Sequence, residues 1–328
     1  MLRRTLVSLI GSMVVVYPLA AHTQPAERPV RIGFLPLGSP TNAYDQSLVE
    51  VLREGLRNVG LVENRDIVLD VVWVGNEAEF PAAISALVGR GAKLLVTAGS
   101  SASPAAKRHT STIPIVFAPV GNPVGIGLVE SHSRPAGNAT GFTDLLSELG
   151  VKYLQFSIEL NKPQAPVHYL WHTEWPDGSS RFQATESAAR TSGVELRSQG
   201  IRDIEEADHV IAAMKKDGAL TLVLQPSPFT NRHRNRIVTV AMNHRVGAIM
   251  AWPETAKDGA LVAYGPSYPD MYLRVGSYVD RILKGAYPGD LPVQDPTKYV
   301  LAINLKTAEA VGVAIPQSLL ARADEVIE

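Results

Sequence analysis

Residues 93–118 read KLLVTAGSSASPAAKRHTSTIPIVFA, and this stretch predicts the fold. The apolar runs 93–97 and 113–118 have the length and composition of buried strands, and residues 102–109 between them predict a short helix. Two strands joined by a helix within so few residues form a crossover unit, whose strands are parallel. The stretch therefore predicts a parallel sheet with helices on its faces.

The same alternation precedes this unit. Strands are predicted at Val30–Leu35 and 67–74, and helices at 42–59 and 79–88. A second series then begins after residue 145. Its predicted helices are 146–160, 180–192, 204–216 and 231–245, and its predicted strands are 167–171, 194–199, 220–224 and 247–251. The fold class is therefore α/β, with two doubly wound parallel-sheet lobes.

The tail continues after the second series is complete. It predicts strands at 259–265 and 298–305 and helices at 271–283 and 306–311. We interpret this as a chain that returns to the first lobe and crosses again, which makes a multi-stranded hinge. The expected division is 28–143 and 260–290 for lobe 1, and 144–259 and 298–328 for lobe 2.

Composition excludes several classes of function. The chain has 328 residues, a formal net charge of −1 and no cysteine. Without a basic excess we expect no nucleic-acid partner. Disulfides, thiolate nucleophiles and cysteine metal sites are excluded outright.

The first residues have the order of a secretory signal peptide. Arg3 and Arg4 are followed by an apolar run over 6–19 and then by small residues. We expect residues 1–23 to be removed, with cleavage within 20–24, and the mature protein to reach the periplasm. An N-terminal membrane anchor is the alternative, and it would need about 20 apolar residues.

Candidate binding residues in lobe 1 follow the predicted strands, because ligands of open parallel sheets bind at the carboxyl ends of strands. Backbone amides and hydroxyls there would suit a carboxylate, although Ser39 or Thr41 would equally suit a helix N-cap. Asn122 would bond a ligand or brace the turn before Pro123. The candidates are Gly38, Ser39, Thr41, Gly99, Ser100, Ser101, Val120 and Asn122.

Lobe 2 adds aromatic and polar candidates at its own strand ends. Aromatic rings at a cleft would stack on a flat solute, and the alternative for each tryptophan is core packing. Trp252 is expected to anchor the ligand while adding little to either core, and Glu254 would pair a ligand amine or cap a helix. The candidates are Trp171, His172, Gln225, Ser227, Trp252 and Glu254. The basic run 232–236 is expected to be a solvated face.

The ordered set of short motifs along the mature chain resembles one family. The motifs are Ile32-Gly33-Phe34-Leu35, Leu37-Gly38-Ser39-Pro40, Thr97-Ala98-Gly99-Ser100, Ile113-Pro114-Ile115-Val116-Phe117, Gly121-Asn122-Pro123-Val124-Gly125, Leu128-Val129, Gly137-Asn138-Ala139-Thr140-Gly141, Gly259-Ala260-Leu261, Tyr264-Gly265, Ile282-Leu283-Lys284-Gly285, Asp290-Leu291-Pro292-Val293 and Ile303-Asn304-Leu305-Lys306-Thr307-Ala308. They are similar to those of the tryptophan-binding-protein-like family of ABC transporter substrate-binding proteins.

That resemblance implies a type I periplasmic-binding-protein fold. It implies a monomer that captures a small organic ligand, an amino acid or an aromatic compound, and delivers it to an ABC permease in the inner membrane. A ligand-sensing domain that partners a membrane receptor is the alternative role.

An exported hydrolase or isomerase is the other class considered. Ser100, His172 and Glu254 are its only plausible nucleophile, base and acid, and nothing in their spacing requires them to meet. His168 and His172 lie about 13 Å apart along one strand, too far for one metal ion. We therefore expect no catalytic residues, no metal and no cofactor.

Overall fold

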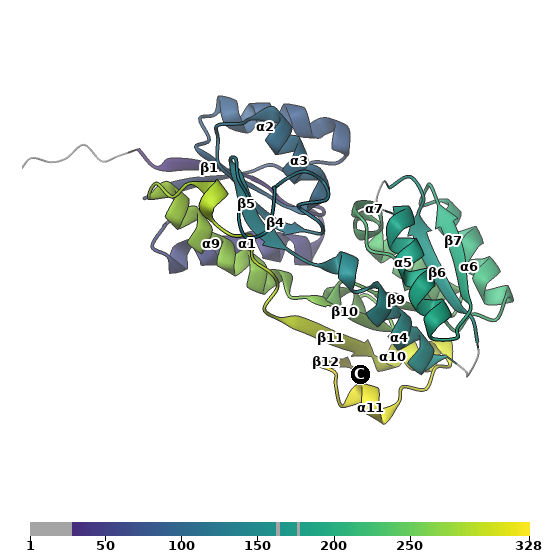
Figure 1. Ribbon diagram of the computed structural model, residues 1–328. Helices are drawn as coiled ribbons and strands as arrows, with labels where there is room; N and C mark the ends of the chain where they lie inside the picture. Colours follow the sequence, from purple (N-terminus) through teal and green to yellow (C-terminus); the bar gives the residue numbers. More distant parts are fainter. Residues whose placement is uncertain (1–27, 162–164, 176–177) are drawn as a thin grey trace, which may run out of the picture.

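The computed structural model describes residues 28–161, 165–175 and 178–328 of the chain. The expected signal peptide lies outside the described residues. Figure 1 shows two lobes, each a sheet flanked by helices. Among the described residues no helix is both long and apolar enough to span a bilayer. The α/β class with two parallel-sheet lobes is as the alternation predicted.

The first lobe is built on a five-stranded parallel sheet in the order β2-β1-β3-β4-β5. Its early elements are β1 (Val30–Leu35), α1 (Ala43–Asn58), β2 (Ile67–Val71), η1 (Glu77–Glu79), α2 (Phe80–Gly89), β3 (Leu94–Thr97), α3 (Gly99–His109), β4 (Ile115–Val120) and β5 (Ala139–Thr143).

Side chains alternate between the two faces of this sheet, as strand geometry requires. Ile32 and Phe34 pack in one core cluster with residues of α1, whereas Leu35 packs in another with residues of α2 and α3. Both faces are thus covered, which explains why these strands are apolar without a polar side.

The second lobe has a seven-stranded sheet in the order β12-β11-β10-β9-β8-β6-β7. Only the β10–β11 pair is antiparallel among the pairings described. Its elements are η2 (Leu146–Glu148), α4 (Gly150–Leu160), β6 (Val167–His172), α5 (Gly178–Thr191), β7 (Leu196–Ile201), α6 (Glu206–Lys216), β8 (Thr221–Leu224), α7 (Pro228–Arg232), α8 (Arg234–Asn243), β9 (Gly247–Met250), η3 (Pro253–Ala256), β10 (Val262–Pro266), β11 (Tyr299–Asn304), α10 (Leu305–Val311), α11 (Gln317–Leu320) and β12 (Glu325–Ile327).

The chain returns to the first lobe through α9 (Tyr268–Leu283) and η4 (Pro288–Asp290). Figure 1 shows α9 beside α1 in that lobe. The helices meet at two glycines: a Cβ on Gly276 would lie 2.1 Å from the carbonyl oxygen of Gly55, and one on Gly55 would lie 2.3 Å from that of Leu273. Glycine at both positions therefore lets the two backbones touch.

One part of the expected division is wrong. The expected division assigns the strand predicted at 259–265 to lobe 1, but β10 pairs with β9 and β11 in the second sheet. The chain returns to lobe 1 after Pro266. Ser267 is the N-cap of α9, and its side chain accepts from the N–H of Asp270. The helix predicted at 231–245 is also two helices, since the Ser227–Thr230 capping box begins α7 earlier.

Candidate functional site

A cavity of about 800 Å³, counted to its open mouth, lies between the lobes. Lobe 1 contributes residues that directly follow β1, β3, β4 and β5, and lobe 2 contributes residues that follow β6, β8 and β9. The cavity thus lies where parallel sheets place ligands, at the carboxyl ends of their strands.

The N-terminus of α3 forms one wall. Gly99, Ser100 and Ser101 line the cavity, and no side chain of the described residues caps this helix end. The Ser100 hydroxyl accepts from the Gly121 N–H at 3.3 Å, and the Ser101 hydroxyl donates to Glu77 Oε1 at 2.5 Å. The helix starts at Gly99, earlier than the predicted 102, so its first amide groups lie at the cavity and favour an anion.

A buried carboxylate lies at the end of β5. Asp144 lines the cavity; its Oδ1 accepts from the Leu146 N–H at 3.2 Å and its Oδ2 accepts from the Tyr268 hydroxyl at 3.2 Å. Burial raises the pKa of Asp144, and the Leu146 hydrogen bond and the charge of Arg181 oppose that shift. A positively charged group placed beside Asp144 in the cavity would favour its ionised form.

Aromatic and basic side chains form the opposite wall. The Arg181 guanidinium lies over the Trp175 ring, 4.3 Å from its centroid. Trp252 is only 2% exposed, and its indole N–H donates to the Tyr268 hydroxyl at 3.2 Å. All four residues line the cavity. The wall therefore combines aromatic rings with two basic side chains, because Arg232 also lines the cavity.

The structure gathers some of the candidate residues at this cavity and leaves others outside. Those that line it are Gly38, Gly99, Ser100, Ser101, Ser227 and Trp252. Trp252 also belongs to the core, contrary to the expectation that it adds little there. Ser227 is occupied with the start of α7, because its side chain and that of Thr230 cap each other's backbone.

The remaining lobe 1 candidates have structural partners instead. The Ser39 and Thr41 hydroxyls lie 2.9 Å apart and bond each other. Val120 is buried in the lobe core. The Asn122 side chain accepts from the Gly125 N–H at 2.9 Å, which is the turn-bracing role.

The remaining lobe 2 candidates at strand ends also point elsewhere. The Trp171 ring stacks on Phe182 at 5.6 Å, and the His172 ring stacks on Phe229 at 4.2 Å. Gln225 is buried and donates to a backbone carbonyl of α5. Residues at the end of a strand alternate between faces, so only part of each loop can reach the cavity.

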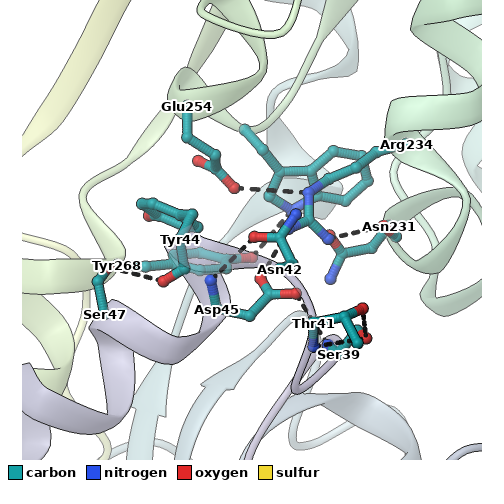
Figure 2. Close-up of polar contacts among 11 residues, drawn as sticks. Ser39, Thr41, Asn42, Tyr44, Asp45, Ser47, Asn231, Arg234, Glu254 and Tyr268 are labelled. Atoms are coloured by element: carbon teal, nitrogen blue, oxygen red, sulfur yellow. Dashed lines mark hydrogen bonds and ion pairs between the residues drawn. The ribbon is translucent and has the colours of Figure 1, made fainter.

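Glu254 lies outside the cavity, in a cluster of charged residues between the lobes (Figure 2). Its Oε1 is 3.8 Å from Arg234 Nε. Arg234 is buried, so the expectation of a solvated face over 232–236 is wrong at this position. Of Ser100, His172 and Glu254, only Ser100 lines the cavity.

Asp144, Arg181 and Tyr268 were missed as candidates. Asp144 follows β5, a strand that was not predicted. Tyr268 follows β10, which was expected in lobe 1 but lies in the second sheet. Arg181 lies in α5 rather than at a strand end. The described residues hold no group of three His, Asp or Glu side chains placed to bind a metal ion.

A family model described as ABC transporter substrate binding protein matches residues 43–327. A curated tyrosine-binding protein of Clostridioides difficile (strain R20291) is 25% identical over 263 residues, which cover 78% of this chain and 74% of that protein.

Solved structures with the same fold include an ABC domain from Streptococcus pneumonia in complex with L-Trp. It has a TM-score of 0.80 and 20% identity, over 91% of this chain and 100% of that one. A conserved domain protein from Vibrio cholerae has a TM-score of 0.80 and 22% identity, with the same coverage.

Proposed function

The chain belongs to the ABC transporter substrate-binding proteins, a family of solute-binding proteins, and from that membership we propose that it captures an amino acid with an aromatic side chain between its lobes. The occupant is thereby a zwitterion with a flat apolar part. In this proposal the protein is an exported monomer, and an ABC permease in the inner membrane receives the ligand.

The observation that carries the proposal is the pairing of opposite polarities in one cavity. The uncapped N-terminus of α3, with the hydroxyl of Ser100, suits a carboxylate. The Asp144 carboxylate suits an ammonium group. A molecule that bears both groups close together, as an α-amino acid does, satisfies both.

The aromatic part of the proposal is supported by the wall of the second lobe. Trp175 and Trp252 are among the residues that line the cavity, and aromatic side chains stack favourably on aromatic ligands. The tyrosine-binding relative and the L-Trp complex named above support the same class of ligand.

Isothermal titration calorimetry with matched ligands tests the proposal. The protein is first unfolded and refolded to remove any carried solute. L-tryptophan and L-tyrosine should bind saturably. Tryptamine, which lacks the carboxylate, and indole-3-propionate, which lacks the amine, should each bind about tenfold more weakly or worse, because the first leaves the N-terminus of α3 and the second leaves Asp144 without a partner. L-alanine carries both charged groups without an aromatic ring, so its affinity measures what the ring contributes. Failure of both aromatic amino acids to bind would contradict the proposal.

The export part has its own measurement. Expression of the full chain in a Gram-negative host should give a periplasmic protein. Its intact mass should correspond to a chain cleaved within residues 20–24. A chain that keeps Met1 and sediments with the membrane would favour the anchor instead.

A further inference from the structure

Arg234 carries a buried ion pair across the boundary between the lobes. It is the first residue of α8 in the second lobe, and its Nη2 lies 2.6 Å from Oδ1 of Asp45 on α1 in the first lobe. The two side chains are 5% and 6% exposed. Figure 2 shows the two side chains pointing toward one another. Separation of the lobes would break this pair and hydrate both charges.

On the first-lobe side, Asp45 is joined to the cavity wall. Its Oδ2 accepts from the Ser39 N–H at 2.9 Å, and a Cβ on Gly38 would lie 2.0 Å from that same oxygen. Gly38 lines the cavity and has a φ of +88°. A side chain at position 38 would therefore displace the carboxylate that Arg234 binds.

On the second-lobe side, Arg234 is joined to the same cavity. Its Nη1 donates to the carbonyl oxygen of Asn231 at 3.0 Å, and Asn231 lines the cavity. The ion pair thus ends at a cavity-lining segment in each lobe, so the distance between these segments and the state of the pair change together.

A second carboxylate shares the guanidinium. Glu254 lies 3.8 Å from Arg234 Nε, which has no hydrogen-bond partner within the described residues. Burial raises the pKa of Glu254 to about 7; the charge of Arg234 and a hydrogen bond from Tyr44 oppose the shift, and the charge of Asp45 adds to it. Tyr44 and Asp45 belong to the first lobe, so part of this environment exists only while the lobes are together.

Other charged and titratable groups face Glu254 from the elements around it. Asp258 follows η3, and burial raises its pKa also. Tyr268 of α9 is neutral, because burial raises the pKa of its hydroxyl well above 10. Lys257, which lines the adjoining pocket, is paired with Glu325 at 3.2 Å. The cluster therefore has more acidic than basic groups. The side chains of Asp45 and Glu254 are 6% and 10% exposed, and burial raises the pKa of Asp45 as well, although the charge of Arg234 opposes that shift.

We propose that Asp45, Arg234 and Glu254 form a latch between the lobes, and that closing it is coupled to the uptake of one proton by Glu254. When the lobes separate, water and the loss of the Asp45 charge let Glu254 ionise. When they close, two buried carboxylates face one guanidinium, and the neutral acid is favoured. The link between this latch and ligand binding rests on the proposed function, because it requires that the two lobes close around a ligand.

The sign of the pH effect follows from linkage. The closed form holds a proton on Glu254 up to about pH 7, whereas a solvated glutamate loses it near its ordinary pKa of about 4.3. Between these values the closed form binds more protons, so lowering the pH from 8 to 6 favours closure. The shift corresponds to up to about a tenfold change in the closed-to-open ratio.

The experiment measures lobe separation in the ligand-free protein. The chain has no cysteine, so Lys93→Cys in the first lobe and Lys216→Cys in the second, both exposed, accept a dye pair for single-molecule energy transfer. From pH 8 to 6 the protein should shift toward the short-distance population. Glu254→Gln, which mimics the neutral acid, should be mostly closed throughout and lose this response. Asp45→Asn should favour the open population at every pH.

Glu205→Gln is the matched control, because Glu205 pairs with Arg236 of the same helix α8 at the exposed surface. It should respond to pH as the unmodified chain does. A pH response that persists in Glu254→Gln overturns the latch, as does no response in the unmodified chain. Because no ligand is added, these outcomes are distinct from a failure to bind amino acids, which would contradict the proposed function alone.

Discussion

The indole N–H of Trp252 and the hydroxyl of Tyr268 form a hydrogen bond of 3.2 Å between the lobes. The same hydroxyl donates onward to Asp144 Oδ2, also at 3.2 Å. One phenol thereby orients the ring and the carboxylate that face the cavity. All three side chains are buried and cannot bond to water, so these hydrogen bonds supply the partners that their polar groups need.

Removal of this hydroxyl should destabilise the fold. Tyr268→Phe leaves the Trp252 N–H without its acceptor and Asp144 with one donor fewer, and we expect the free energy of unfolding to fall by about 1–3 kcal/mol. Urea denaturation followed by circular dichroism measures it. Tyr287→Phe is the control, since Tyr287 is 54% exposed. Equal stability of the two variants would contradict the role of the bridge.

Trp252 and Trp175 should respond differently to truncation. Trp252→Ala removes a buried core ring, and we expect a loss of about 3–5 kcal/mol in unfolding free energy together with weaker ligand binding. Trp175 is more exposed, so Trp175→Ala should weaken ligand binding by about 1–3 kcal/mol and change stability little. Calorimetric titration and thermal melts of the ligand-free variants separate the two effects. Similar melting losses for both would refute the distinction.

Asp144→Asn tests the ammonium site. The asparagine can still accept from the Leu146 N–H, so the local turn should survive. L-tryptophan should bind about tenfold more weakly or worse, because a charged hydrogen bond is lost. Indole-3-propionate has no amine and serves as the control ligand, and its affinity should not fall. An equal loss for both compounds would show that Asp144 acts through structure alone.

The glycine contact between α1 and α9 should tolerate no side chain. In Gly276→Ala the new Cβ would lie 2.1 Å from the carbonyl oxygen of Gly55. The helices must then move apart, and we expect a loss of at least about 1–3 kcal/mol in unfolding free energy. Gly89→Ala, at the end of α2, meets nothing within 4 Å and should be neutral or slightly stabilising. Chemical denaturation of the pair compares them directly.

Stability should depend on pH through Glu254. Its pKa is about 7 in the folded protein and near 4.3 when unfolded. Stabilisation by proton binding is therefore complete below the unfolded pKa and is lost as the pH rises through 7. From pH 6 to 8 the unfolding free energy should fall by about 1 kcal/mol more in the unmodified chain than in Glu254→Gln. Parallel pH profiles for the two proteins would show that Glu254 does not titrate in this range.

The alternation of apolar runs was sufficient to predict two parallel-sheet lobes, because fully covered strands have a strong local pattern. β5 was missed because Ala139–Thr143 is short, has a glycine at its centre and follows a glycine-rich stretch. The loss of this one strand also hid Asp144, whose importance lies only in its place at a strand end.

Burial by the partner lobe was not predictable from local sequence. Arg234 stands in a run of basic residues, and its buried partner Asp45 lies far away in the chain. The serines beside Gly99 could be placed at the cavity because glycine at a strand end has a local signal. Ser39, Asn122 and Trp171 also lie at or just beyond the ends of predicted strands, but their partners are structural.

The path of the chain also constrains the order in which the molecule assembles during synthesis. The face of the first sheet that α1 covers is completed only by α9, which follows nearly all of the second lobe. A nascent chain that ends before residue 268 lacks α9. Gly55 of α1 and the ring of Phe34 then lack the residues of α9 that pack against them. The core of the first lobe is therefore complete only after α9 has been synthesised, and a fragment that ends at residue 143 is expected to aggregate instead of folding.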